Sequence, residues 1–320
     1  LQDKKEIKSA IKIYKQALVI KPNDAELHHN LGIAYQKDNQ LNEAILEFKK
    51  SLVINPKYPD ALNSLGNIYQ KNKKYMIAIN YFEKAINLKQ NFVTAQYNLG
   101  VTYHMIRNYK LAIKYYKNTI DLNPNFVLAL NNIGIAYQEQ GDYIKGMKYF
   151  EKATNTNPEF PAPIYNIGFG YEKIGNLDKA ILFYEKVLLI KADYINAIIN
   201  LGNIWKKKEN INKAINTYKK ALNYNKENAD VINNLGICFQ DSNYIENAIS
   251  YYNQALKIDP NHQDAMNNLG VCYKILGHID ESIIYFKNAI DINNNDAETH
   301  TNLAHTLLLK GDYEEGWKEY

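Results

Sequence analysis

Long apolar runs and cysteines are both scarce in this sequence of 320 residues. No stretch approaches the roughly 18 consecutive apolar residues of a membrane-spanning helix, so we expect no membrane partner. Leu1 stands in mid-pattern, without the basic and then apolar leader of a secreted protein. Two cysteines, Cys238 and Cys272, cannot build a disulfide framework, which fits a reducing compartment. We therefore expect a cytoplasmic or nuclear protein.

Arginine is almost absent, and neither sign of charge dominates. A single arginine, Arg107, stands against 37 lysines, and the formal net charge is +4. This total by itself indicates no partner. The 44 asparagines could reflect an AT-rich genome as easily as selection for function. Hydrophobic residues make up 46% of the chain and charged residues 22%, which allows a buried core and excludes a disordered chain.

What the sequence does contain is an internal repeat. The triplet Asn-Leu-Gly that begins at Asn30 returns at Asn98 and at Asn200, at multiples of 34 residues. With Ala25 as repeat position 1, residues 25–296 form eight complete repeats without insertion or deletion. They begin at Ala25, Pro59, Val93, Val127, Pro161, Ile195, Ala229 and Gln263. Residues 1–24 form the C-terminal part of a preceding repeat, and residues 297–320 fill positions 1–24 of a truncated ninth.

Small and bulky residues alternate within each repeat at spacings that predict two antiparallel helices. Position 8 is glycine in all eight complete repeats and Ala304 in the ninth, which predicts a close approach of the two helices. Position 20 is also small, while positions 11 and 24 are aromatic in nearly every repeat. Pro at position 32 is expected to end the second helix, because it lacks an amide hydrogen. The repeats with Gln90, Ala192, Lys226 or Asn294 there should still turn.

This pattern resembles the tetratricopeptide repeat over the whole chain: small at position 8, aromatic at 11, Ala at 20, aromatic at 24, small at 27 and Pro at 32. The resemblance implies an all-α fold, a right-handed α-solenoid superhelix of antiparallel helix pairs. We expect about 18 helices of about 12 to 15 residues, with each first helix starting near position 1. Most aromatic side chains should then belong to the core.

Patterns for catalysis and cofactor binding are weak. Gly168, Gly170 and Gly175 loosely resemble a dinucleotide loop, but they lie in and after a predicted first helix with no preceding strand. No two histidines have the three- or four-residue spacing that aligns metal ligands on a helix. Cys238 and Cys272 lie one repeat apart, too far for a disulfide. We therefore predict no catalytic residues, no metal and no cofactor in this chain.

The first helices are predicted to line the concave face, and they exclude basic residues. Positions 1–11 of the nine repeat starts contain no Lys or Arg, although they contain acids. A bound nucleic acid would need such cations to replace its counterions, so we expect no nucleic-acid partner. The same absence argues against the carboxylate-clamp members of this repeat family, which use basic residues at positions 2, 5 and 6. Here these positions hold residues such as Asp60, Asn63 and Ser64.

In place of cations, position 6 carries a column of asparagines, broken only by Ser64. Its members are Asn30, Asn98, Asn132, Asn166, Asn200, Asn234, Asn268 and Asn302. A regular row of amides can pair with the backbone of an extended peptide, whose donors and acceptors repeat whatever its side chains are. These eight residues are the predicted peptide-binding site. The alternative is that the amides hydrogen-bond within or between first helices, or reflect the abundance of Asn in the chain.

An unbroken run of such repeats with an asparagine ladder resembles the superhelical domain of intracellular protein O-glycosyltransferases, of the O-GlcNAc transferase and SPINDLY-type O-fucosyltransferase kinds. In that family the ladder grips acceptor proteins, and residues 311–320 resemble the last repeat before the catalytic region. The resemblance implies an acceptor-recognition domain, and a homodimer through the convex face is also compatible with it. The alternative function is a free-standing adaptor that assembles a protein complex without a linked enzyme.

Overall fold

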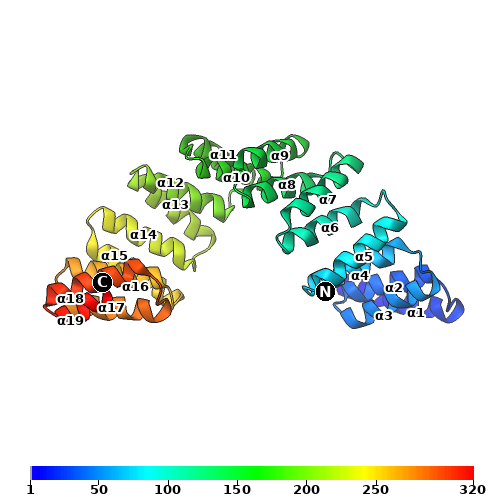
Figure 1. Cartoon of the computed structure of the whole chain (residues 1–320), viewed down its shortest axis with the longest axis horizontal. Coiled ribbons are helices and arrows are strands. Elements are labelled where there is room, and N and C mark those ends of the chain that lie inside the picture. Colours follow the sequence, from blue (N-terminus) through cyan, green and yellow to red (C-terminus); the bar gives the residue numbers. More distant parts are fainter. Residues whose placement is uncertain (1) are drawn as a thin grey trace. The chain divides into compact units, whose positions relative to one another are not determined.

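The computed structural model describes residues 2–320. In this range the chain forms nineteen helices joined by short turns, and no strand. The helices form two compact units, residues 1–174 and 175–320. Within each unit, helices that follow one another in the sequence pack together as antiparallel pairs (Figure 1). The all-α solenoid of helix pairs predicted from the repeat is therefore confirmed.

Even-numbered helices are the first helices of their repeats. They are α2 (Ala25–Lys37), α4 (Pro59–Lys71), α6 (Val93–Met105), α8 (Val127–Glu139), α10 (Pro161–Lys173), α12 (Ile195–Lys207), α14 (Ala229–Asp241), α16 (Gln263–Ile275) and α18 (Ala297–Lys310). Each begins at repeat position 1, as predicted. All have 13 residues except α18, which has 14.

Odd-numbered helices are the second helices. They are α1 (Gln2–Ile20), α3 (Leu41–Ile54), α5 (Tyr75–Leu88), α7 (Tyr109–Leu122), α9 (Tyr143–Thr156), α11 (Leu177–Ile190), α13 (Ile211–Tyr224), α15 (Ile245–Ile258), α17 (Ile279–Ile292) and α19 (Tyr313–Glu319). The helix α1 differs from the repeat frame, which places a turn near residue 5. Its 19 residues instead continue through that point as one helix.

The contact between position 8 and position 24 sets the distance between the two helices of a repeat. A Cβ atom added to Gly134 would lie 2.4 Å from Cε1 of Phe150, and one added to Gly66 would lie 2.5 Å from Cε1 of Phe82. Both rings are fully buried. Because no side chain fits in this space, the helix backbone lies directly against the ring, as the glycine pattern predicted.

Second helices end at the same repeat position with or without proline. Position 31 takes an extended backbone both before Pro124, at Asn123 (φ −142°), and before Ala192, at Lys191 (φ −137°). The prediction that the junctions without proline still turn is therefore confirmed. The end of the helix depends on packing against the next first helix as well as on the missing amide hydrogen of proline.

The turn between the two helices of a repeat requires a left-handed residue at position 15. Four repeats place glycine there, whereas others place Lys73, Arg107 or Glu209 at φ between 57° and 59°. The amide of the following residue then donates to the carbonyl of position 11, as Lys74 does to Tyr69 at 2.9 Å. The only arginine of the chain thus occupies a strained turn position.

Replacing Lys73, Arg107 and Glu209 together by glycine is expected to stabilise the protein. Left-handed backbone costs a residue with a Cβ about 1–2 kcal/mol, and the greater freedom of glycine in the unfolded chain offsets about 0.5–1 kcal/mol of that gain. The triple variant should therefore melt a few degrees higher in a thermal scan followed by circular dichroism. The matched control Lys74→Gly, at φ −86°, should lower the melting temperature. A triple variant that melts lower than the wild type contradicts the assigned turn.

Candidate peptide-binding face

The candidate site is the face that the even-numbered helices form within each unit, which we call the first-helix face. Neighbouring first helices touch one another directly: α4 contacts α6, α8 contacts α10, and α16 contacts both α14 and α18. Side chains at positions 5 and 6 therefore meet across the boundary between repeats. All eight asparagines of the predicted ladder lie on this face and are half-buried.

Ladder amides are hydrogen-bonded from one repeat to the next. Asn98 Nδ2 donates to Oδ1 of Asn63, and Asn166 Nδ2 donates to Oδ1 of Asn131, both at 3.1 Å. The acceptor in each case is position 5 of the preceding repeat. The same bond recurs at 3.1 Å in the second unit, from Asn268 to Asn233 and from Asn302 to Asn267.

Where position 5 is not asparagine, another polar group takes its role. Asn132 Nδ2 donates to the hydroxyl of Tyr97 at 3.1 Å, and Ser64 Oγ lies 3.1 Å from Nε2 of His29. Asn200 and Asn234 have different partners. Asn200 Nδ2 donates to the hydroxyl of Tyr184 at 3.1 Å. Position 5 of the repeat before Asn234 is Ile199, which offers no side-chain acceptor, and Asn234 Nδ2 donates to Oδ1 of Asn203 at 3.5 Å.

Asn30, the first member of the ladder, lies in a hollow between α1 and α2. It lines this hollow of about 430 Å³ together with Tyr14, Ile33 and Lys37. No hydrogen bond to its side chain is formed within the described part of the chain. The ladder is thus a bonded series from Asn98 onward and not at its first position.

These bonds bear on the two interpretations of the column. The inter-repeat bonding that the sequence left as an alternative is present, because each Nδ2 group from Asn98 onward binds the preceding repeat. The acceptor oxygens of the same side chains differ from the Nδ2 groups, because several of them are not hydrogen-bonded within the described part of the chain. Over the described residues, Oδ1 of Asn98, Asn166, Asn268 and Asn302 accepts no hydrogen bond, and the side chains are partly open to solvent. Two ladder oxygens in each unit therefore have no hydrogen-bond donor among the described residues.

Glutamines at position 12 add a second set of links between first helices, which the sequence reasoning missed. Gln70 Nε2 donates to the backbone oxygen of Asn98 at 3.1 Å and to Oγ1 of Thr102 at 2.8 Å. Gln138 Nε2 donates to the backbone oxygen of Asn166 at 2.8 Å. The sequence signal was the recurrence of Gln at position 12, but a polar residue at this position is equally typical of a solvent-exposed side chain.

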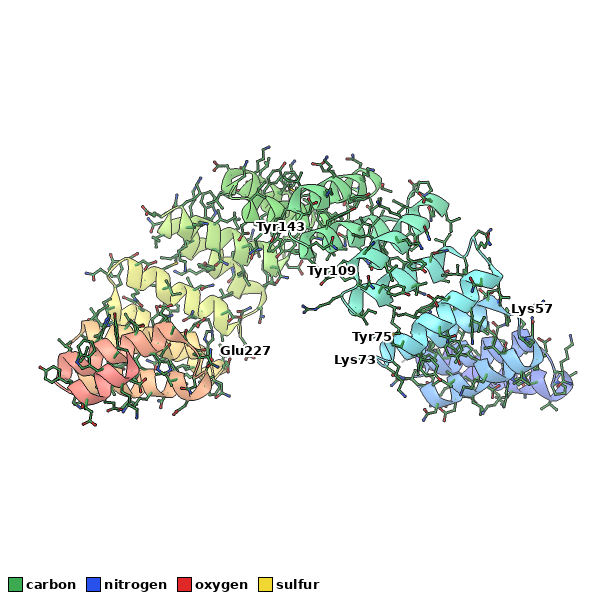
Figure 2. The ribbon with its side chains drawn as sticks, viewed as in Figure 1. Lys57, Lys73, Tyr75, Tyr109, Tyr143 and Glu227 are labelled. Carbon is green, nitrogen blue, oxygen red and sulfur yellow. The ribbon has the colours of Figure 1, made fainter. Side chains whose placement is uncertain are left out.

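Tyrosines at position 17 form another feature that the sequence reasoning passed over. Tyr75, Tyr109 and Tyr143 open the second helices α5, α7 and α9, and they follow one another along the first unit (Figure 2). All three are half-buried. Tyr109 packs edge-on against His104, with ring centroids 5.4 Å apart.

Charge on the first-helix face differs along each helix. The first eleven positions carry no Lys or Arg, but the helices extend to position 13 and place cations such as Lys71 and Lys207 at their C-terminal ends. The exclusion of basic residues therefore holds for the first three turns and not for the whole helix. Burial lowers the pKa of His29, which is opposed only in part by the nearby Asp60, so this imidazole adds no positive charge at neutral pH.

Two histidines at position 4 make equivalent contacts in the first and last first helices. His28 Nδ1 lies 2.5 Å from Oε2 of Glu47, and His300 Nδ1 lies 2.6 Å from Oε2 of Glu319. In both cases Nε2 faces the backbone oxygen of position 32 in the preceding repeat. These contacts join repeats. No group of three His, Cys, Asp or Glu side chains in the described range is arranged to hold a metal ion.

Both cysteines are free and buried in the packing between repeats. Burial raises the pKa of each thiol, to about 11. Cys272 Sγ also donates to Oε1 of Gln240 at 3.4 Å.

Neither thiol should react with a disulfide reagent such as dithionitrobenzoate at pH 8 while the protein is folded. The reactive thiolate is a small minority species at a pH well below the pKa, and the sulfur atoms are covered. Absorbance at the reagent's product band should rise to two equivalents only after denaturant is added. Fast reaction of the native protein at pH 8 would show that the thiols are more accessible than the structure has them.

Family models of the tetratricopeptide repeat match most of the chain. A model described as TPR repeat matches residues 3–39, 37–73 and 202–243. Models described as tetratricopeptide repeat match residues 59–92, 93–126, 115–147, 163–194, 229–262, 251–284 and 285–318. The chain therefore belongs to the tetratricopeptide repeat family. No curated protein matches it significantly.

Solved structures similar to this chain include YrrB, described as a TPR protein with an unusual peptide-binding site. It is 25% identical with a TM-score of 0.51, over 59% of this chain and 97% of YrrB. PilF of Pseudomonas aeruginosa is 20% identical with a TM-score of 0.56, over 65% of this chain and 94% of that one. The Cut9–Hcn1 hetero-tetramer of the APC/C is 17% identical with a TM-score of 0.57, over 83% and 52%. The last two support the fold alone.

No helix among residues 2–320 is long and apolar enough to span a lipid bilayer.

Removing the bonded ladder amides is expected to destabilise the array. The variant Asn98→Ala, Asn166→Ala, Asn268→Ala deletes four inter-repeat bonds, because Asn98 also donates to Oδ1 of Asn67 at 2.8 Å, and it leaves three position-5 oxygens without a donor. At about 1 kcal/mol for each lost bond, unfolding in urea should occur at a clearly lower midpoint. Asn234→Ala serves as the matched control, because its bond of 3.5 Å is the weakest of the series. A triple variant as stable as the wild type would mean that the bonds do not hold neighbouring repeats together.

Proposed function

We propose that this chain is a protein-interaction scaffold that binds extended peptide segments along the first-helix face. The observation that carries the proposal is the set of ladder oxygens of Asn98, Asn166, Asn268 and Asn302, each held in place by the hydrogen bond that Nδ2 of the same side chain donates to the preceding repeat. Oxygen atoms fixed in this way need no ordering when a ligand arrives, which favours binding. An extended peptide offers backbone N–H donors at regular intervals to such a row.

The charge of the face defines the kind of peptide. Acids at position 2, Glu26 and Asp60 in the first unit and Asp230, Asp264 and Glu298 in the second, stand at the N-terminal ends of first helices that carry no cation over three turns. Such a surface repels acidic peptides and favours neutral or basic ones. The similarity to YrrB, whose description names a peptide-binding site, agrees with this proposal.

A test should remove the acceptor oxygens and keep the inter-repeat donors. Ser64 already fills position 6 with a hydroxyl that bonds His29, so Asn→Ser is the mildest exchange available in the chain. We expect Asn98→Ser, Asn132→Ser, Asn166→Ser to raise the dissociation constant of a neutral extended peptide about tenfold. This follows from losing up to three hydrogen bonds of modest strength. Isothermal titration calorimetry measures the effect, and circular dichroism verifies the fold.

The control places the same exchange on exposed asparagines of second helices, Asn87→Ser, Asn155→Ser, Asn223→Ser. Binding by this variant should equal that of the wild type. A poly-glutamate peptide should bind more weakly than the neutral one to all three proteins. Equal peptide binding by the ladder variant and the control would rule out the ladder as the site.

A more specific hypothesis makes this face the acceptor-recognition domain of a protein O-glycosyltransferase. It rests on the resemblance of the ladder and of residues 311–320, and the comparisons add no support to it. The free-standing adaptor is the alternative. Assaying the product of the whole gene for transfer from UDP-GlcNAc and GDP-fucose distinguishes them. If mutation of the ladder lowers the rate of transfer to protein acceptors but not to short peptides, the glycosyltransferase hypothesis is favoured.

A further inference from the structure

Second helices carry an aromatic column of their own. In most repeats the ring at position 23 stacks on the ring at position 11 of the same repeat. The stacked pairs, with their centroid distances, are Tyr69–Tyr81 (5.5 Å), Tyr103–Tyr115 (5.5 Å), Tyr137–Tyr149 (5.7 Å), Phe239–Tyr251 (5.0 Å) and Tyr273–Tyr285 (5.3 Å). The stacked ring fills the groove between neighbouring second helices, as Tyr81 does between α3 and α5.

The repeat of residues 195–228 breaks this pattern. Its position 11 is Trp205, but position 23 is Thr217, whose hydroxyl donates back to the backbone oxygen of Lys213 at 2.7 Å. The other positions without an aromatic ring, Glu47 and Glu319, have a histidine partner instead. At Thr217 the corresponding residue is Ile198, so no such pair replaces the missing ring.

A hollow opens where the ring is missing. It has a volume of about 670 Å³ between α11 and α13, and its apolar lining includes Leu188, Leu189, Ile198, Leu201 and Trp205. The corresponding hollow between α3 and α5, where Tyr81 is present, measures about 440 Å³. In other repeats a stacked aromatic side chain fills the space beside position 11. Beside Trp205 this space is therefore open.

A second residue that differs from the repeat pattern, Leu189, lines the same hollow as Thr217. Leu189 stands at position 29 and is 87% exposed. In the other complete repeats this position is polar except at Val53, and in the partial repeat at the start of the chain it is Val19. The polar residues are Asn87, Asp121, Asn155, Asn223, Lys257 and Asp291. An exposed leucine at the lip of an apolar hollow has no function in packing this chain, and it supplies contact area for a partner.

The rim of the hollow is positively charged. Lys213 and Lys220 stand on α13, and Glu185 on α11 is the one acid of the lining. No ion pair joins either lysine to an acid within the described residues. Lys213 Nζ lies 4.3 Å from the centroid of the Trp205 ring, a cation–π contact. A carboxylate beside an inserted ring would therefore meet an ammonium group at the mouth of the hollow.

We propose that the hollow between α11 and α13 binds an acidic segment of a partner protein, which inserts one aromatic side chain against Trp205. The inserted ring takes the place that position 23 fills in other repeats, and flanking carboxylates pair with Lys213 and Lys220. The hollow opens between the second helices α11 and α13 and is also lined by side chains of α12, but no asparagine of the ladder belongs to its lining, so the site is distinct from the ladder. A scaffold with both sites holds two different protein segments at once.

The test fills the hollow from within. Thr217→Tyr restores the ring that other repeats have, so it should fold as well as the wild type. The probe is a fluorescein-labelled peptide with one phenylalanine between two glutamates on each side, and its binding is followed by fluorescence anisotropy. Thr217→Tyr should raise its dissociation constant at least tenfold. The matched control Thr217→Val leaves the hollow open and should bind within twofold of the wild type.

Charge and ring are tested separately. Lys213→Gln with Lys220→Gln should weaken binding and flatten its dependence on salt. The same peptide with alanine in place of phenylalanine should bind at least tenfold more weakly.

Several results would overturn the proposal: no binding to the wild type, equal binding by Thr217→Tyr, or equal binding of the alanine peptide. A second copy of this chain is the competing occupant, because Trp317 and Tyr320 are exposed beside acidic residues. Self-association in sedimentation velocity that Thr217→Tyr abolishes would assign the hollow to a dimer and refute the acidic-segment proposal. Binding of the neutral peptide to the first-helix face should be unaffected in every variant, which separates this outcome from that of the proposed function.

Discussion

The contact on which the rest of the structure depends is that of a glycine backbone against an aromatic ring. Rings at position 24 lie so close to position 8 that a Cβ atom on Gly134, Gly202 or Gly236 would come within 2.4–2.6 Å of them. This contact fixes the separation and rotation of each helix pair. Because every complete repeat has glycine at position 8 and an aromatic residue at 24, most neighbouring pairs are presented to one another alike, and residues 35 apart are hydrogen-bonded at six of the boundaries.

The ladder follows from that regularity. A residue at position 6 meets position 5 of the repeat before it, so one asparagine column both joins repeats and presents acceptor oxygens. The partners Asn63, Tyr97 and His29 differ in chemistry but occupy the same place. The structural role and the proposed binding role thus belong to different atoms of one side chain: the Nδ2 group bonds the preceding repeat, and in Asn98, Asn166, Asn268 and Asn302 no described donor bonds Oδ1. Alanine substitution removes both, which is why serine is the more informative exchange.

In a repeat array, departures from the repeat are more informative than the consensus. The consensus explains the core, since packing alone accounts for the stacked rings and the small residues. Thr217 and Leu189 are not required by packing, and they lie at one hollow on the second helices. The glutamates at position 23 are departures of another kind, because each is paired with a histidine of its own repeat, and Nε2 of that histidine faces a backbone oxygen of the preceding repeat.

The sequence by itself determined the helices, their order and most of the core, because a strict period of 34 residues leaves one way to place small and bulky side chains. It also placed the eight asparagines at the same position of their first helices. Only the tertiary structure decided which ladder atoms are already bonded, since a partner 35 residues away depends on the rotation between repeats. The same holds for the hollow beside Trp205, which requires α11 and α13 side by side. The structure also decided that α1 is one continuous helix. The repeat period places a turn near residue 5, but the period alone does not fix the backbone conformation there.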